Sequence, residues 1–396
     1  MNKMSVGDIE TEGKKVLVRV DFNVPLDERG EITDDNRIQA ALPTIKYLVG
    51  CGAKVILISH LGRPKGKVVD ALRLRVVAKR LSQILGQPVG MAADCIGPEV
   101  KKDTDKLGNG DVLLLENVRF YPEEEKNDAS FAQSLAQLGE IYVNDAFGAA
   151  HRAHASVVGI TNYLPAVAGL LLEKEVKTLG GILENPARPF TLLLGGAKIS
   201  DKIGMLENIK DKADSLLVGG GMAATFLKAN SYEIGSSLVE EDKLEFVTKL
   251  MKDIAEYGTR VLLPVDVVVA DKISTEAECR VVPIGGIPTD MSIVDIGPLT
   301  IESFSRELEK CKTVFWNGPM GIYEIPQFAT GTQAMARLLA SLKATTVIGG
   351  GSTAEAVAKL KLADKMTFVS TGGGASLEFL SGEVLPGVEA LMDKQA

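Results

Sequence analysis

Two lysines in the middle of the chain, Lys198 and Lys202, stand four residues apart, directly after Gly195 and Gly196. A helix that began after the glycines would carry both ammonium groups on one face of its first turns, where like charges repel and the helix dipole disfavours cations. An anion held between the two side chains would remove both penalties, and the free amides at a helix start bind phosphate. We therefore interpret this stretch as a phosphate site.

The first half of the chain supplies a second group of residues suited to binding anions. They follow apolar runs and comprise Asp21, Asn23, Arg37, His60, Arg63, Arg119 and Arg152. Guanidinium groups bind carboxylate and phosphate in bidentate fashion. Because the formal net charge of the chain is −8, solubility does not explain arginines gathered at one edge. We expect a site for a small, multiply anionic metabolite, in which His60 takes part, whereas His154 is expected to be structural.

The elements that must position these residues are short buried strands. Apolar runs in the first half predict strands over 16–20, 54–58, 111–115 and 141–143, separated by predicted helices over 38–51, 72–85 and 129–138. This alternation is typical of an α/β fold with a parallel sheet and crossover helices. In such sheets ligands bind at the carboxyl ends of the strands, which is where the polar residues stand.

The second half of the chain repeats the alternation of predicted strands and helices, but glycine rather than arginine follows its strands. Strands are predicted over 191–194, 215–218, 261–263, 313–316, 345–348 and 367–369, and most of them lead into glycine-rich segments. Glycine lets a ligand approach the backbone and the amides of the following helix, so this half suits a nucleotide. A predicted helix over 173–183 and the proline-bounded stretch 185–189 separate the halves, which gives domains over 1–172 and 173–379.

Composition narrows the functional class. A chain of 396 residues is longer than a single hydrophobic core usually organises, which favours two domains. Its negative net charge argues against nucleic acid or a membrane surface as a partner. The four cysteines lack metal-ligand or CxxC spacing, so we expect reduced thiols in a cytoplasmic protein. The first eight residues carry no apolar signal segment, and the stretches 164–172 and 261–270 are too short to span a bilayer.

A nicotinamide dehydrogenase is the main alternative from the residues alone. Gly219-x-Gly-x-x-Ala224 and Gly349-x-Gly-x-x-Ala354 match the dinucleotide fingerprint, and Glu240 stands near the distance expected for a ribose-binding acid. Glycine triplets generate this match easily, and neither copy opens a domain. No GxxxxGK[ST] phosphate loop occurs in the chain.

The strand-end segments form an ordered series of motifs. In the first half these are Arg19-Val-Asp-Phe-Asn-Val-Pro25, Ser59-His-Leu-Gly-Arg-Pro64, Leu115-Glu-Asn-Val-Arg-Phe120, Asn144-Asp-Ala-Phe-Gly148 and Ala150-His-Arg-Ala-His154. In the second half they are Gly195-Gly-Ala-Lys198 with Asp201-Lys202, Trp316-Asn-Gly-Pro-Met-Gly321 and Ser370-Thr-Gly-Gly-Gly-Ala-Ser376. In this order they resemble the phosphoglycerate kinases over almost the whole chain.

The resemblance implies two Rossmann-like three-layer α/β domains with parallel sheets, joined by a long helix and a hinge, with a tail over about 380–396 that packs back on the first domain. It implies a monomeric glycolytic enzyme that transfers a phosphoryl group reversibly between 1,3-bisphosphoglycerate and MgADP, giving 3-phosphoglycerate and MgATP. Mg²⁺ is the implied cofactor. In the reverse direction the nucleophile is a carboxylate that is already ionised at neutral pH, so no general base is expected.

The same resemblance implies roles for individual residues. Contacts with 3-phosphoglycerate are implied for Asp21, Phe22, Asn23, Arg37, His60, Leu61, Gly62, Arg63, Arg119 and Arg152. Contacts with the Mg-nucleotide are implied for Lys198, Lys202, Glu324, Gly350, Gly351, Ser352 and Thr353, with Glu324 facing the ribose. Stabilisation of the transferring phosphoryl is implied for Arg37, Lys202 and Gly373.

Two positions depart from the family pattern. Ser352 stands where the family usually has an aspartate that would ligate Mg²⁺, so we expect a weaker or water-bridged metal contact with activity retained. Ile293 stands where many relatives have a glycine near the adenine, which predicts a tighter or differently walled base pocket. If Ser352 disabled metal binding, the chain would instead be a nucleotide-binding module without catalysis.

Overall fold

The computed structural model describes residues 2–394, and the chain divides into two compact units. The first unit runs through Lys177 and resumes at Val384, and the second covers Thr178–Glu383. Helix α6 (Leu170–Glu184) contains the point of division, so one continuous helix belongs to both units. The boundary between the two units thus lies after Lys177, whereas the sequence pattern predicts a boundary after residue 172.

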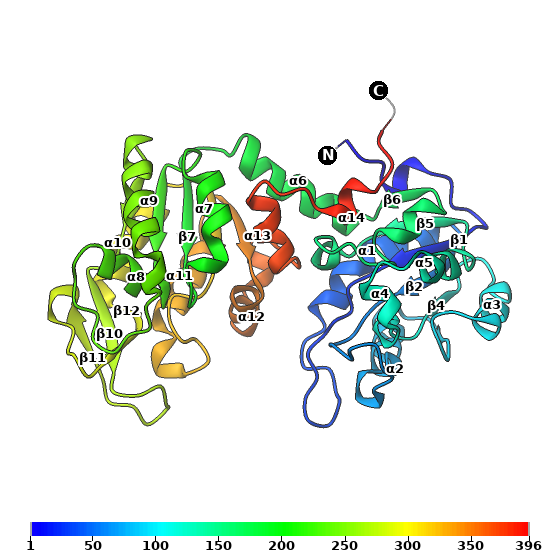
Figure 1. The fold of residues 1–396 in the computed structure, drawn as a ribbon, viewed down its shortest axis with the longest axis horizontal. Helices are drawn as coiled ribbons and strands as arrows, with labels where there is room; N and C mark the ends of the chain where they lie inside the picture. The colour runs from blue at the N-terminus through cyan, green and yellow to red at the C-terminus, as the bar shows by residue number, and fades with distance from the viewer. Residues whose placement is uncertain (1, 395–396) are drawn as a thin grey trace. The chain divides into compact units, whose positions relative to one another are not determined.

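The first unit contains a six-stranded parallel sheet with flanking helices (Figure 1). The strand order is β3-β4-β2-β1-β5-β6, with bounds β1 (Lys15–Arg19), β2 (Lys54–Ile58), β3 (Val89–Met91), β4 (Val112–Leu114), β5 (Ile141–Asn144) and β6 (Ala166–Ala168). The helices are α1 (Asn36–Gly50), α2 (Arg75–Leu85), α3 (Pro98–Asp105), α4 (Pro122–Glu125), α5 (Ala129–Ala136) and α14 (Pro386–Glu389). The strands are continuous apolar runs because both faces of a parallel sheet are covered.

Helix α1 shows how the sequence forms this unit. Its buried residues include Ile38, Leu42, Ile45 and Leu48, which is the spacing that gives a helix one apolar stripe. That stripe packs in the same core cluster as the buried side chains of β1 and β2. The helix therefore begins beside the sheet edge where the candidate site residues stand, and it carries Arg37 in its first turn.

The C-terminal segment belongs to the first unit. The amide of Gly387 donates to the carbonyl of Ala150 at 2.8 Å, and the amide of Met392 donates to the carbonyl of Ala166 at 2.9 Å. The side chain of Asn144 adds a hydrogen bond to the carbonyl of Gly387 at 2.9 Å. These bonds attach residues from α14 onward to the ends of β5 and β6.

The second unit contains another six-stranded parallel sheet, in the order β15-β14-β13-β7-β8-β9 (Figure 1). Its strands are β7 (Phe190–Leu194), β8 (Ser215–Val218), β9 (Arg260–Leu262), β13 (Thr313–Asn317), β14 (Thr345–Gly349) and β15 (Phe368–Val369). Its helices after α6 are α7 (Ile203–Ile209), α8 (Met222–Ala229), α9 (Leu244–Glu256), α10 (Pro298–Leu308), α11 (Thr330–Leu339), α12 (Gly351–Lys359) and α13 (Gly374–Leu380). The predicted α/β class with two parallel sheets is confirmed.

A small antiparallel sheet in the second unit was not expected from the sequence. It consists of β10 (Asp266–Ala270), β11 (Cys279–Pro283) and β12 (Ser292–Ile296), with β10 in the middle. The outer strand β11 is mostly exposed, and its short sequence Cys-Arg-Val-Val-Pro lacks the continuous apolar run of the central parallel strands. Among residues 2–394, no helix has the length and hydrophobicity needed to cross a membrane.

Candidate functional site

The predicted anion-binding residues of the first unit gather at one edge of its sheet. Strands β4, β2, β1 and β5 are neighbours and run parallel, so their carboxyl ends meet at that edge. The segments that follow them carry, in chain order, Asp21, His60, Arg119 and Arg152. The sheet topology therefore brings together residues that are far apart in the sequence.

Asp21 is the centre of a charged group within this edge. Its Oδ2 forms an ion pair with Nη1 of Arg37, and its Oδ1 lies 4.0 Å from Nε2 of His60. Burial opposes ionisation of the carboxyl, but the positive charges of Arg37 and Arg19 outweigh it and hold the pKa of Asp21 below its ordinary value. Burial lowers the pKa of His60 well below the usual range, and nearby arginines add to this effect. His60 is therefore neutral at physiological pH.

The loop after β2 is held in place by two hydrogen bonds at Gly62. The Gly62 amide donates to Oδ1 of Asn23 at 2.8 Å, and its carbonyl accepts from Nη1 of Arg119 at 2.9 Å. Arg63 follows directly, is exposed, and makes no hydrogen bond or ion pair within residues 2–394. Its guanidinium group is thus available to a ligand.

Arg119 is the most unusual cation of this edge, because it is only 4% exposed. Burial, together with the positive charges of Arg19 and Arg152, lowers the pKa of Arg119 to about 10. Its Nε has no hydrogen bond, and the nearest carboxylate oxygen, of Glu125, lies 3.5 Å from it. A buried guanidinium group next to like charges is stabilised by an anion.

Phe22 and Leu61 are placed differently from the polar residues. Both side chains are buried in the core of the first unit. The amide of Phe22 donates to Oγ of Ser59 at 2.9 Å, and the carbonyl of Leu61 accepts from Nδ2 of Asn117 at 2.8 Å. These two residues shape the loops that carry the ligand-facing groups.

The expectation of one helix carrying both lysines is wrong. Lys198 is exposed in a loop, Lys202 ends a single 3-10 turn (Ser200–Lys202), and helix α7 begins after it. Oε2 of Glu240 accepts the amides of Ile199 at 2.6 Å and Ser200 at 3.3 Å. This carboxylate, distant in the sequence, holds the loop that carries the lysines.

The two lysines consequently differ in environment. Lys202 is 6% exposed, and burial lowers its pKa although Asp201 and Glu240 oppose the shift. A Cβ added at Gly196 would lie 3.5 Å from Nζ of Lys202, so the ammonium group borders the glycine turn. Lys198 makes no hydrogen bond or ion pair within the described residues.

The glycines at these strand ends permit close backbone packing. Gly318 has φ +93°, and a Cβ there would lie 2.2 Å from the carbonyl oxygen of Gly195. Gly220 has φ +62°, and a Cβ there would lie 2.5 Å from the amide nitrogen of Gly196. No other residue type fits such contacts, so the glycines bring the ends of β7, β8 and β13 together beside Lys202.

The start of helix α12 adjoins the same region. Oγ1 of Thr353 accepts the amide of Gly318 at 2.7 Å, and Gly350 turns the chain with φ +88°. Asn317 is buried, its Nδ2 has no hydrogen-bond partner, and a Cβ added at Gly350 would lie 2.9 Å from that atom. An unpaired buried amide beside free helix amides is suited to a phosphate oxygen.

Asn317 and Glu240 are residues that sequence reasoning did not place in the nucleotide site. Asn317 stands in the quoted Trp316-to-Gly321 motif at the end of β13, so its position offered a signal. The sequence spacing indicates Glu240 only as a ribose-binding acid, whereas its side chain holds the loop that carries the lysines. Neither role could be recognised without the spatial contact.

The remaining predicted nucleotide residues are exposed or at helix starts. Glu324 makes no hydrogen bond or ion pair within residues 2–394. Gly373 precedes helix α13 with φ +52°, and a Cβ there would meet nothing within 4 Å. The structure therefore joins Lys202, Gly350 and Thr353 through the glycine turns.

Ser352 offers a single exposed hydroxyl oxygen at the start of α12. In the described part of the chain, no group of three or more His, Cys, Asp or Glu side chains could hold a metal ion. Mg²⁺ commonly keeps several waters and is held largely by substrate phosphates. The donor set thus fits Mg²⁺ that arrives with the nucleotide as part of the substrate.

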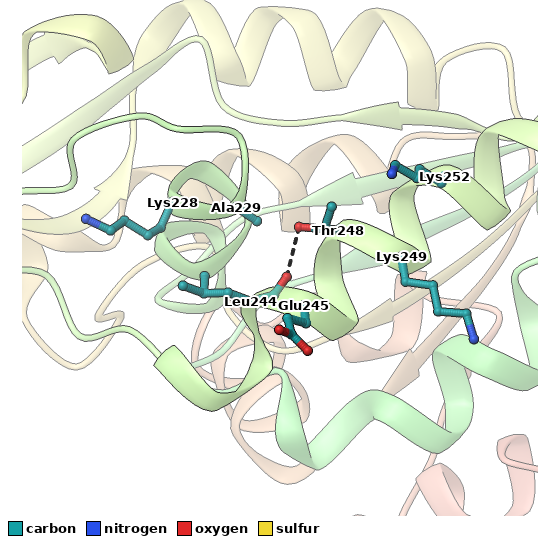
Figure 2. A pocket seen from close by; sticks show the side chains of 7 residues that line it. All are labelled: Lys228, Ala229, Leu244, Glu245, Thr248, Lys249 and Lys252. Carbon is teal, nitrogen blue, oxygen red and sulfur yellow. Dashed lines mark hydrogen bonds between the residues drawn. The ribbon is translucent and has the colours of Figure 1, made fainter.

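A surface pocket of about 460 Å³ lies elsewhere on the second unit, between α8 and α9 (Figure 2). It is lined by Lys228, Ala229, Leu244, Glu245, Thr248, Lys249 and Lys252. Figure 2 shows the side chains of Lys228 and Lys249 pointing away from one another. No predicted site residue lines this pocket, so it is separate from the nucleotide region.

Comparisons with known proteins identify the family of the chain. The family model described as phosphoglycerate kinase matches residues 6–383. The phosphoglycerate kinase of Synechococcus elongatus is 57% identical over 97% of this chain and 96% of its own length, and that of Pelotomaculum thermopropionicum is 54% identical over 100% of both. The solved phosphoglycerate kinases of Coxiella burnetii and Pyrococcus horikoshii share 41% and 32% identity, each with a TM-score of 0.86 over 98% of both chains.

Proposed function

The chain belongs to the phosphoglycerate kinase family, and on that premise we propose how its residues transfer a phosphoryl group between 1,3-bisphosphoglycerate and MgADP. The first unit binds the three-carbon acid and the second binds the Mg-nucleotide. The observation that supports this division is Arg119, which is buried close to the positive charges of Arg19 and Arg152 and whose Nε makes no hydrogen bond. Such an excess of buried positive charge suits the phosphate and carboxylate of a small substrate.

The nucleotide proposal rests on the glycine turns around Lys202. Backbone amides at the start of α12, Nδ2 of Asn317 and the ammonium group of Lys202 supply hydrogen-bond donors to phosphate oxygens. Mg²⁺ is part of this substrate, where it neutralises phosphate charge, and Ser352 contributes at most one neutral oxygen. The dehydrogenase alternative loses its expected ribose-binding acid, because the carboxylate of Glu240 accepts the amides of Ile199 and Ser200.

The transfer step needs no general base. The attacking carboxylate of 3-phosphoglycerate has a pKa of about 3.5 to 4 and is ionised at neutral pH. The protein's task is to align the two substrates and stabilise charge on the transferring phosphoryl. Lys202 serves from the nucleotide side, with the amides near Gly373. Arg37 serves from the acid side, because only its Nη1 is engaged by Asp21 and no other hydrogen bond occupies its guanidinium group in residues 2–394.

Each substrate is assigned to its own unit, so the proposal requires closure of the units around helix α6. Closure would bring the reacting atoms to about 3 to 3.5 Å and exclude water that would hydrolyse the acyl phosphate. We further propose a monomeric cytoplasmic enzyme with no nucleic-acid or membrane partner. Its support is the net charge of −8 and the four free cysteines.

A coupled assay tests the proposal. The purified chain is supplied with 3-phosphoglycerate and MgATP, and acyl phosphate formation is followed by its reduction with a coupling dehydrogenase and NADH. We expect turnover that needs both substrates, and Arg119→Gln is expected to raise the KM for 3-phosphoglycerate about tenfold or more without changing that for MgATP. A rate that is independent of 3-phosphoglycerate, or an equal change in both KM values, would contradict the division of substrates.

A further inference from the structure

Arg19 is the one fully buried arginine at the sheet edge, with 0% of its surface exposed. It ends strand β1, and its side chain makes three contacts. Nη1 donates to the carbonyl of Val20, Nε donates to Oγ of Ser156 at 2.8 Å, and Nη2 lies 3.1 Å from Nδ1 of His60. Arg19 thus joins the end of β1 to the loops after β2 and β5.

The contact with His60 fixes the position of the imidazole proton. An arginine side chain has five N–H donors and no acceptor, so Nδ1 of His60 must be the acceptor. The ring is neutral in this environment, because burial lowers the pKa of His60 well below its usual value. A neutral imidazole that accepts at Nδ1 carries its proton on Nε2.

The Nε2–H group of the buried His60 side chain is not occupied by the protein. Oδ1 of Asp21 lies 4.0 Å from Nε2, which is beyond hydrogen-bond distance. No hydrogen bond to Nε2 occurs within residues 2–394. The charged groups around the ring are Asp21, Arg19, Arg119 and Arg37, so an anionic ligand at this edge would meet a neutral donor among cations.

A buried carboxylate holds Arg19 from the other side. Oε1 of Glu124 accepts from Oγ of Ser156 at 2.6 Å, and Oε2 accepts the amide of Ser156 at 2.8 Å. The Ser156 hydroxyl cannot donate to Arg19, so it donates to Glu124 and uses a lone pair for Nε–H. Glu124, Ser156 and Arg19 are each 0% exposed. These hydrogen bonds fix the donor and the acceptor at each step from Glu124 to His60.

We propose that Glu124, Ser156 and Arg19 form a positioning relay that holds His60 as an Nε2–H donor for the anionic three-carbon substrate. The role of the relay in substrate binding rests on the proposed function, whereas the predicted tautomer of His60 does not depend on that function. Glu124 lies in α4, after the segment of Arg119, and Ser156 lies in the loop of Arg152. The relay therefore also connects the two segments that carry Arg119 and Arg152. Its members act through His60 and are positioning residues.

The direct test is NMR of the unliganded full-length chain labelled with ¹⁵N-histidine. The chain has only three histidines, and His151→Gln and His154→Gln assign the rings. The relay predicts that Nε2 of His60 shows the protonated, pyrrole-like shift and Nδ1 the unprotonated one, from pH 6 to 8. A protonated Nδ1, or an equal mixture of tautomers, overturns the relay whatever the enzymatic activity.

A kinetic comparison of two serine variants tests whether the relay contributes to substrate binding. Ser156→Ala removes the bridging hydroxyl, and Ser134→Ala removes a hydroxyl that only contacts the carbonyl of Ser130. Ser156→Ala is expected to raise the KM for 3-phosphoglycerate about five- to tenfold and to leave the KM for MgATP unchanged. The ¹⁵N chemical shifts of His60 should move toward the average of the two tautomers. Unchanged shifts and KM values in folded Ser156→Ala refute the relay. Retained tautomer shifts that do not respond to added 3-phosphoglycerate refute the substrate assignment instead.

Discussion

Replacement of Lys202 by methionine removes one buried positive charge while keeping the length of the side chain. Lys202 is 6% exposed and has no ion pair within the described residues, and burial lowers its pKa. A charge about 4 Å from the transferring phosphoryl contributes about 4 kcal/mol at an effective dielectric of about 20. This corresponds to about a thousandfold in turnover.

Lys198→Met is the matched control, because Lys198 is exposed. At the same distance in water a charge contributes only about 1 kcal/mol, so we expect Lys198→Met to lower turnover about fivefold. Turnover would be measured for both variants in the coupled assay with saturating 3-phosphoglycerate and MgATP. Thermal unfolding should show no loss of stability in Lys202→Met, since an unpaired buried ammonium group is itself unfavourable.

Equal losses in the two variants would refute the assignment of the catalytic charge to Lys202. So would a loss of less than tenfold in Lys202→Met with the fold intact. A loss in Lys202→Met confined to the KM for MgATP would mean that the ammonium group binds the nucleotide without acting in the transfer.

Three other changes give measurable outcomes. Ser352→Asp should lower the Mg²⁺ concentration needed for half-maximal rate at fixed nucleotide, and an unchanged Mg²⁺ dependence would exclude a metal contact at this position. Gly318→Ala should reduce the free energy of unfolding in urea by about 1 to 3 kcal/mol, since the new Cβ would lie 2.2 Å from the Gly195 carbonyl. Burial lowers the pKa of His154 to about 4, so the unfolded chain binds a proton below pH 6.5 that the folded chain does not. His154 should therefore contribute a fall of about 2 kcal/mol in the free energy of unfolding from pH 8 to 5, and this contribution should be absent in His154→Gln.

Residues at the ends of apolar runs were predictable from the sequence. Asp21, His60 and Arg119 each follow a continuous stretch of buried residues, and parallel topology alone brings such positions to one edge. The glycines at the ends of β7 and β8 carried a similar signal. In both cases the information lies in local sequence, because a strand end and the residue after it are neighbours in the chain.

Contacts between distant segments were not predictable in this way. Glu240 accepts the amides of Ile199 and Ser200 from 41 and 40 residues away and holds the loop that carries the lysines. Arg19 stands within an apolar run, and its partners His60 and Ser156 lie 41 and 137 residues away. Strand β11 is exposed, and its short sequence Cys-Arg-Val-Val-Pro does not distinguish it from a loop. Each of these features depends on tertiary packing that periodicity does not encode.

Small-angle X-ray scattering tests most directly whether two separately bound anionic substrates are brought together by closure. The radius of gyration would be compared for the free chain, for the chain with 3-phosphoglycerate, with MgADP, and with both ligands at saturation. The proposed mechanism predicts the smallest radius with both ligands present, and a clearly smaller effect of either ligand alone. Equal radii in the free and doubly liganded states, with binding of both ligands verified by calorimetry, would contradict it.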